Sequence, residues 1–197
     1  TSAVFNIPNL SALNITQRAD VGKGSNTVAF GDTAIAFFNP SVDSGLKVDL
    51  PFASGTIDFS GATLTSIDGL TSLSVKNGSV ISQGTGLVNF GQTLTANVNG
   101  TIDLGALDNT FGGVVTLSAA SVNLSSATGL ILGDALITGS LTAKTAGEIG
   151  QANGTLVRVS TLQLQAMGPV TLTNGGNDFD TLEVSGSGEL AVQDVDS

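Results

Sequence analysis

The stretch GGNDFDTLEV at residues 175–184 has the residue types of a calcium-binding loop. Acidic nonapeptides with paired glycines bind calcium between the coils of β-solenoids through carboxylate oxygens. The pattern occurs once, however, and Asp178 stands where the nonapeptide requires another glycine. The related stretch DNTFGG at 108–113 keeps the Asn and the Phe but lacks both matching carboxylates. We therefore predict that 175–184 is a structural corner and that the chain has no metal site.

Asp58 and Asp103 are a second candidate pair, because glycoside hydrolysis needs two carboxylates about 5–10 Å apart. They occupy equivalent places in GTIDF at 55–59 and GTIDL at 100–104. Two strand spacings would separate them by roughly 10 Å. Ile81 holds the intervening place, and no Arg, Lys or aromatic residue accompanies the pair. We interpret them as solvated acids on an outer face and predict no catalytic residues and no enzyme activity.

The composition excludes several classes of function. The chain contains no His, Cys, Trp or Tyr, so the usual nucleophile–base pairs, zinc sites and haem ligands are absent, and we expect no cofactor. The net charge is −10 and the six basic residues are scattered, which argues against nucleic acid as a partner. No apolar stretch approaches the roughly 20 residues of a membrane span, so membrane insertion is not expected.

A short pattern recurs along the chain at regular spacing. A small residue, any residue and an aliphatic residue occur together seven times, usually after an alternating apolar run. The copies begin at positions 55, 78, 100, 120, 147, 168 and 188, so the successive intervals are 23, 22, 20, 27, 21 and 20. This regular period indicates a solenoid. The longest interval holds SSATGLILGDALITGS, which we interpret as a longer coil or a bulged strand.

We predict an all-β fold, a parallel β-helix (β-solenoid) of about 22 residues per coil and roughly seven to eight coils. The alternative is a β-sandwich. Alternation places aliphatic side chains inside and Ser, Thr and Asn outside. Stacked coils align equivalent residues, so Ile57, Val80 and Ile102 should form one vertical file. Gly at the corners permits the tight bends.

The pattern divides the chain into two parts. Residues 46–197 form one domain of solenoid coils, and residues 1–45 fit less well. We interpret 1–45 as an N-terminal segment that either caps the first coil or docks onto another subunit. Residues matching GLILG, which follow Phe111, have no counterpart after Phe179. We therefore expect the stack to continue beyond 197 in the parent protein or in the next subunit.

Four short stretches resemble the repeats of filamentous-haemagglutinin-like adhesins and related large repetitive exoproteins of Gram-negative bacteria. They are LG at 132–133, GSLTA at 139–143, GEI at 147–149 and GNDF at 176–179. The resemblance covers residues 48 to 197. It implies a right-handed parallel β-helix that is exported across the outer membrane and serves adhesion or matrix building.

These observations lead to three hypotheses about function. The first is a non-enzymatic extracellular structural or adhesive β-solenoid segment of a bacterial surface exoprotein, whose partner is a host or neighbouring-cell surface. The second is a self-assembling subunit of an extracellular filament or biofilm matrix, in which copies stack end to end through unpaired backbone groups. The third is a polysaccharide-active or receptor-binding β-helix. All three place the protein outside the cell, secreted or at the bacterial surface.

Overall fold

The computed structural model describes residues 2–5, 13–16, 26–30, 35–37, 45–59, 65–67, 69–81, 87–106, 108–186 and 188–196. These residues form β-strands and turns, with no helix and therefore none long and apolar enough to cross a membrane. The N-terminal strands are β1 (Ser2–Phe5), β2 (Leu13–Thr16), β3 (Asn26–Phe30), β4 (Ile35–Phe37), β5 (Gly45–Asp58), β6 (Thr65–Ile67) and β7 (Leu70–Ile81). The central strands are β8 (Val88–Phe90), β9 (Leu94–Val98), β10 (Thr101–Leu104), β11 (Thr110–Phe111), β12 (Val114–Ala119) and β13 (Ser121–Ser126). The C-terminal strands are β14 (Leu130–Thr145), β15 (Ile149–Gln151), β16 (Val157–Ala166), β17 (Val170–Leu172), β18 (Asp178–Gly186) and β19 (Leu190–Val192).

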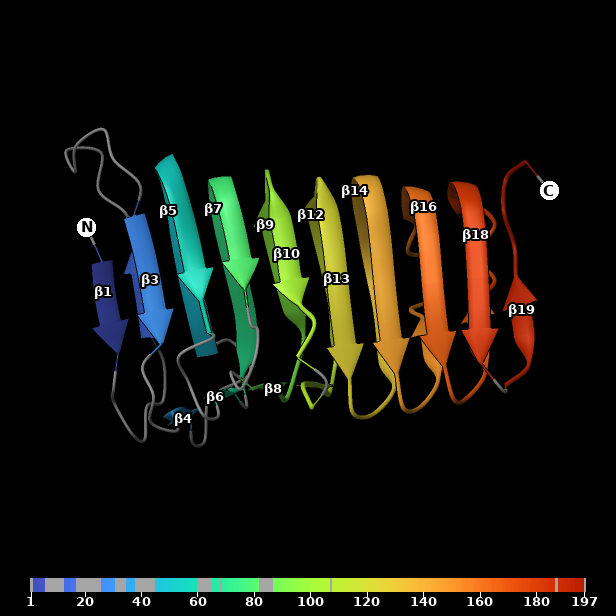
Figure 1. The fold of residues 1–197 in the computed structure, drawn as a ribbon, viewed down its shortest axis with the longest axis horizontal. Helices are drawn as coiled ribbons and strands as arrows, with labels where there is room; N and C mark the ends of the chain where they lie inside the picture. Colours follow the sequence, from blue (N-terminus) through green and yellow to red (C-terminus); the bar gives the residue numbers. More distant parts are fainter. Residues whose placement is uncertain are drawn as a thin grey trace.

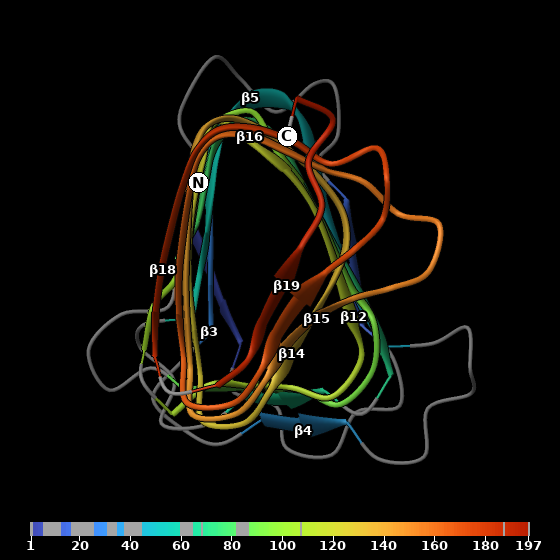
Figure 2. The ribbon, with the colours of Figure 1, turned by 90° about the vertical axis from the view of Figure 1, so that its right-hand side faces the viewer.

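The strands stack as a parallel β-solenoid, which confirms the predicted fold class. The regular part has about six turns of roughly 21 residues each. The front strands in Figure 1 run downward, and the chain advances from left to right with each turn. These two directions together make the coil right-handed. This is the hand that crossover connections between parallel strands favour. Figure 2 shows the closed cross-section that the turns share.

The predicted file of aliphatic residues is present. Val80 pairs with both Ile57 and Ile102, and all three side chains are fully buried. The file extends in both directions and also contains Val28, Val122, Leu141, Leu162 and Leu182. Inward and outward residues alternate along each strand, as in the burial of β9. Nearest-neighbour stacking of these apolar residues therefore forms a continuous core.

The predicted register of the later corners is wrong. The seven copies of the small–x–aliphatic pattern imply one file for all their aliphatic residues. Those of the last three copies, Ile149, Val170 and Leu190, instead form a second file on another face together with Leu130. In the first file, the turn after Val122 ends at Leu141, well before Ile149. The small–x–aliphatic pattern occurs at two different corners. The interval between the copies at 120 and 147 is long because the first copy lies at one corner and the second at the other.

The prediction of a bulged strand in that interval is confirmed. The long strand β14 contains two irregularities against its neighbours. Against β12, the register shifts between Val115 and Leu117, and against β16 it shifts between Ile137 and Ser140. Because each bulge adds a residue and bends the strand, β14 can turn from one face of the solenoid to the next without ending.

Three phenylalanines pack together at the small sheet of β4, β6, β8 and β11, and two of them, Phe90 and Phe111, belong to its strands. Phe59 and Phe90 are fully buried, and their rings meet edge to face with centroids 6.2 Å apart. Phe90 stacks on Phe111 with centroids 5.7 Å apart. Aromatic pairs of this geometry add to the free energy gained by burial alone.

The described strands within residues 1–45 take part in the same parallel pairing. β1 pairs with β3, β3 and β2 pair with β5, and β4 pairs with β6. The boundary at 45 and the role of this segment as a cap or a docking element remain predictions, since most of its residues lie outside the described part of the chain.

Candidate functional site: an asparagine corner and two surface grooves

The corner at 175–184 places its amide inside the solenoid and its carboxylates outside. Asn177 is fully buried and Phe179 is 7% exposed, whereas Asp178 and Asp180 face solvent. Across the described ranges, no group of three acidic, His or Cys residues is close enough to hold a metal ion. The geometry supports the interpretation of this stretch as a structural corner.

Asn177 joins four neighbouring segments by hydrogen bonds, one of them from its Nδ2 to the Gln193 carbonyl at 3.3 Å. Its Oδ1 accepts from the Val157 N–H at 3.0 Å, and its Nδ2 donates to the Leu172 carbonyl at 3.2 Å. The Gln151 amide adds two more bonds, one in each direction, at 2.7 and 3.0 Å. Because these backbone groups are buried or half-buried, the side chain provides partners that water cannot supply.

Asn109 makes the same backbone contacts in an earlier turn. Its Oδ1 accepts from the Val88 N–H at 2.8 Å, and its Nδ2 donates to the Leu104 carbonyl at 2.8 Å. Phe111 follows two positions later and is buried, as Phe179 is after Asn177. The sequence prediction that both stretches share a turn Asn and a buried Phe is confirmed.

The two asparagine corners nevertheless lie on different sides of the solenoid. Asn109 lies between β10 and β11, and Asn177 lies between β17 and β18. Three turns from Ile102 lead to Leu162. These three turns contain 60 residues (162 − 102), and the same step from Asn109 leads to Pro169. Asn177 lies eight residues further along the chain (177 − 169), which is about one face of the solenoid.

Asp58 and Asp103 occupy equivalent positions, as predicted. Ile81 is paired with both and separates them by one strand. The Oδ1 of Asp103 accepts hydrogen bonds from the Gly105 N–H at 3.2 Å and from the Asn123 side chain at 2.9 Å. These contacts give Asp103 a structural role on the outer face, and Asn123 continues the same file.

The outer face carries hydrogen bonds from one turn to the next. The Thr142 hydroxyl donates to Gln163 Oε1 at 3.1 Å, and Gln163 Nε2 donates to Glu183 Oε2 at 2.9 Å. The three residues are aligned by the strand register. Polar side chains that point outward therefore also hold adjacent turns in register.

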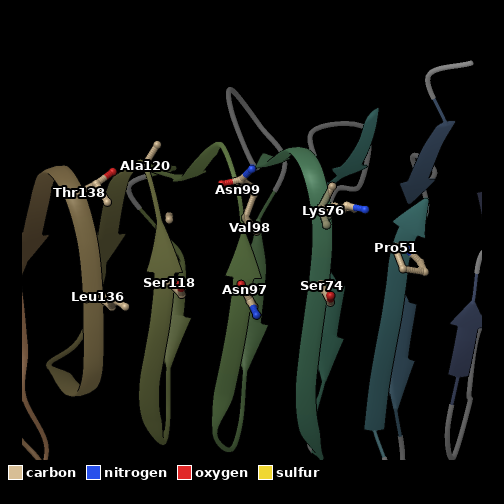
Figure 3. Close-up of a pocket in the computed structure, with 12 residues that line it drawn as sticks. Pro51, Ser74, Lys76, Asn97, Val98, Asn99, Ser118, Ala120, Leu136 and Thr138 are labelled. Carbon is tan, nitrogen blue, oxygen red and sulfur yellow. The ribbon is translucent and has the colours of Figure 1, made fainter. Parts of the chain in front are cut away.

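Two shallow grooves run along the solenoid between rows of outward side chains. The first has a volume of about 470 Å³, and Figure 3 shows its rows crossing several turns. One row contains Ser74, Asn97, Ser118 and Leu136, and the other contains Lys76, Asn99, Ala120 and Thr138. Leu136 is 59% exposed, and the described residues of the lining include one cation and no carboxylate. Amides, hydroxyls and apolar side chains such as Ala120 and Leu136 suit binding better than acid–base chemistry.

The second groove, of about 350 Å³, lies on the face that carries Thr142, Gln163 and Glu183. Lys144 and Gln165 line its other side. Glu183 is its one lining carboxylate, and that group accepts the hydrogen bond from Gln163. Among the lining residues that the structure describes, neither groove has the two carboxylates that glycoside hydrolysis uses.

Sequence reasoning did not single out the grooves or Gln151. The grooves depend on which outward files lie next to each other, which follows only from the register. One weak signal could have indicated that Gln151 has a structural role. It occupies a position that is in register with the buried Leu132, where an apolar residue is usual. A polar residue at an apolar position of a solenoid indicates a buried hydrogen-bond partner, which here is Asn177.

A family described as repeats of unknown function (DUF5649) matches residues 53–118 and 119–192, which together make up most of the chain. The chain belongs to this family. The boundary between its two DUF5649 repeats falls beside the corner at Ala120, where β12 ends and β13 begins. Three turns separate Ile57 from Val122 and three more separate Val122 from Leu182, so each repeat spans about three turns. No curated protein and no solved structure matches the chain.

Proposed function

We propose that the chain is a non-enzymatic structural segment of a bacterial extracellular exoprotein, which acts as a rigid rod that holds adhesive surfaces away from the cell. The observation that carries this proposal is the unbroken file from Val28 to Leu182. Each turn adds about 4.8 Å of length, so the six regular turns span on the order of 30 Å. The length of such a rod is set by the number of turns.

The surface chemistry supports the same proposal. The outer rows are mostly hydroxyls and amides, many of which bond to the adjacent turn. The resemblance to filamentous-haemagglutinin-like repeats supports placement outside the cell. The two grooves are the surfaces that we assign to contact with a host or neighbouring cell.

The test uses the parent protein in its own cells. Antibodies raised against the 197-residue chain should label intact cells, and deleting one DUF5649 repeat should shorten the surface projection without abolishing export. Labelling only after the cells are lysed would refute the extracellular assignment. Turnover of a glycan that is lost in Asp58→Ala or Asp103→Ala would refute the non-enzymatic assignment.

A second candidate, end-to-end stacking of copies into a filament, is favoured by one observation. Leu190 is 56% exposed, although Ile149 and Val170, which precede it in the same file, are buried. Parallel strand edges of this kind accept a further strand. Sedimentation of the purified chain should then show concentration-dependent assembly, and Leu190→Asp should reduce it. A monomer at all concentrations would argue against the filament.

A further inference from the structure

The chain contains four Asn-Gly dipeptides, at 77–78, 99–100, 153–154 and 174–175. In such a dipeptide the glycine backbone nitrogen lies close to the side-chain amide carbon of the preceding Asn. Because glycine has no Cβ, little hinders the approach of these two atoms. The structure describes the side chains of Asn99, Asn153 and Asn174, so their surroundings can be compared.

Asn153 and Gly154 are the unrestrained pair. They lie in the loop between β15 and β16, which projects from the side of the solenoid, and both are exposed. Gly154 has a φ of 75°, and nothing lies within 4 Å of the place where a Cβ would stand. Within the described part of the chain, neither the Asn153 side chain nor the Gly154 N–H makes a hydrogen bond.

The Asn174 side chain is held in place. Its Nδ2 donates to the Ala152 carbonyl at 2.7 Å and to the Thr155 carbonyl at 2.9 Å. Attack by the next backbone nitrogen requires this amide to turn away from both carbonyls. We expect the loss of two hydrogen bonds to slow the reaction by about ten- to a hundredfold relative to an unrestrained Asn.

Gly100 restrains the pair at 99–100. It is stacked so closely on Gly78 that a Cβ would lie 2.0 Å from the Gly78 carbonyl oxygen. Its own carbonyl accepts a hydrogen bond from the Ala120 N–H at 2.9 Å. The backbone of Gly100 is thus fixed between two turns, and its nitrogen cannot swing toward the Asn99 side chain without breaking the stack.

We propose that Asn153 is a site of spontaneous covalent modification, at which the chain converts Asn to aspartate or isoaspartate. The Gly154 nitrogen loses its proton to water or hydroxide and attacks the Asn153 Cγ. A carbon–nitrogen bond forms, the carbon–Nδ2 bond breaks, and the amide leaves as ammonia. Water then opens the five-membered succinimide at either carbonyl and returns a proton to the Gly154 nitrogen. The net reaction consumes one water, releases one ammonium ion and leaves one added negative charge on the chain.

The modification changes the loop in which it occurs. The isoaspartate product inserts an extra carbon into the backbone between Ala152 and Thr155, the two residues whose carbonyls Asn174 holds. Thr155 also donates its hydroxyl to the Ala152 carbonyl at 2.7 Å, which closes the turn. The longer backbone cannot keep all of these contacts, so the loop loosens while the buried files beneath it stay intact.

Peptide mapping by mass spectrometry tests the proposal on the 197-residue chain during incubation at mildly alkaline pH. The native chain is compared with the same chain in denaturant, where every Asn-Gly dipeptide is free and gives a reference rate. We expect native Asn153 to react at a rate close to its denatured reference. Asn99 and Asn174 should fall about tenfold or more below theirs.

Asn153→Gln is the matched variant, because a six-membered ring closes far more slowly. Conversion of Asn153 adds a negative charge, so it produces an early, more acidic charge variant in isoelectric focusing of the native protein. Asn153→Gln should remove this early charge variant and leave the circular dichroism spectrum unchanged. The proposal is overturned if native Asn153 is protected as strongly as Asn99 and Asn174, or if the early charge variant persists in Asn153→Gln.

Discussion

Thr71 is the one buried side-chain polar group without a hydrogen-bond partner among the described residues. It lies in a file of aliphatic residues, paired with Leu46 on one side and Leu94 on the other. Thr71 is 2% exposed, and both leucines are buried as deeply. The hydroxyl therefore loses its hydration on folding and gains no partner in return.

Thr71→Val replaces this hydroxyl with a methyl group of similar shape. An unsatisfied buried polar group costs about 1–3 kcal/mol. We therefore expect Thr71→Val to raise the free energy of unfolding by about 1–3 kcal/mol. At the size of this chain, each kcal/mol raises the Tm by roughly 2–4 °C.

Urea denaturation followed by circular dichroism measures the effect. Thr71→Ser keeps the hydroxyl and loses a methyl group, so it should be less stable than wild type by about 1 kcal/mol. Thr95→Val, at an exposed position of β9, controls for strand propensity and should change stability by less than about 0.5 kcal/mol. If Thr71→Val is neutral or destabilising, the hydroxyl has a partner and the reasoning fails.

The remaining predictions concern the corners and the register. Asn109→Ala removes the partners of two buried backbone groups and should destabilise the chain by about 2–4 kcal/mol in urea denaturation, with unchanged stability the contradicting result. Gly100→Ala places a Cβ 2.0 Å from the Gly78 carbonyl oxygen and should cost about 1–3 kcal/mol, while Gly150→Ala, with nothing within 4 Å, should be nearly neutral in the same assay. Deleting residues 102–121 removes one whole turn, because Ile102 and Val122 are in register. The shortened chain should keep a β-rich circular dichroism spectrum and cooperative unfolding, and a deletion half as long should lose both.

The sequence was sufficient for the fold because the same physical requirement recurs at each turn. Ile57, Val80 and Ile102 each follow a small corner residue, and a solenoid can bury all three only by aligning them. Asn177 and Phe179 could be assigned to a corner because Asn109 and Phe111 repeat them without the carboxylates. Local patterns of this kind depend only on neighbours along the chain.

The register of the later turns and the grooves could not be predicted, because they depend on distances across the coil. Gly147 and Gly139 both fit the corner pattern, and only the pairing of Val122 with Leu141 selects Gly139 for the first file. The sequence around Thr71 is that of an ordinary strand, and its burial follows only from its pairing with Leu46 and Leu94 on the adjacent turns. Side chains on different turns become neighbours only after the number of residues per turn is fixed.

The displacement between the two asparagine corners has a consequence for longer arrays. A unit that advances by whole turns would present the same side chains along one line. Asn109 and Asn177 instead differ by about one third of a turn, so the second corner is rotated relative to the first. Because the repeats themselves advance by about three whole turns, the aliphatic files of a tandem array would stay straight along the rod, while its asparagine corners would face more than one side.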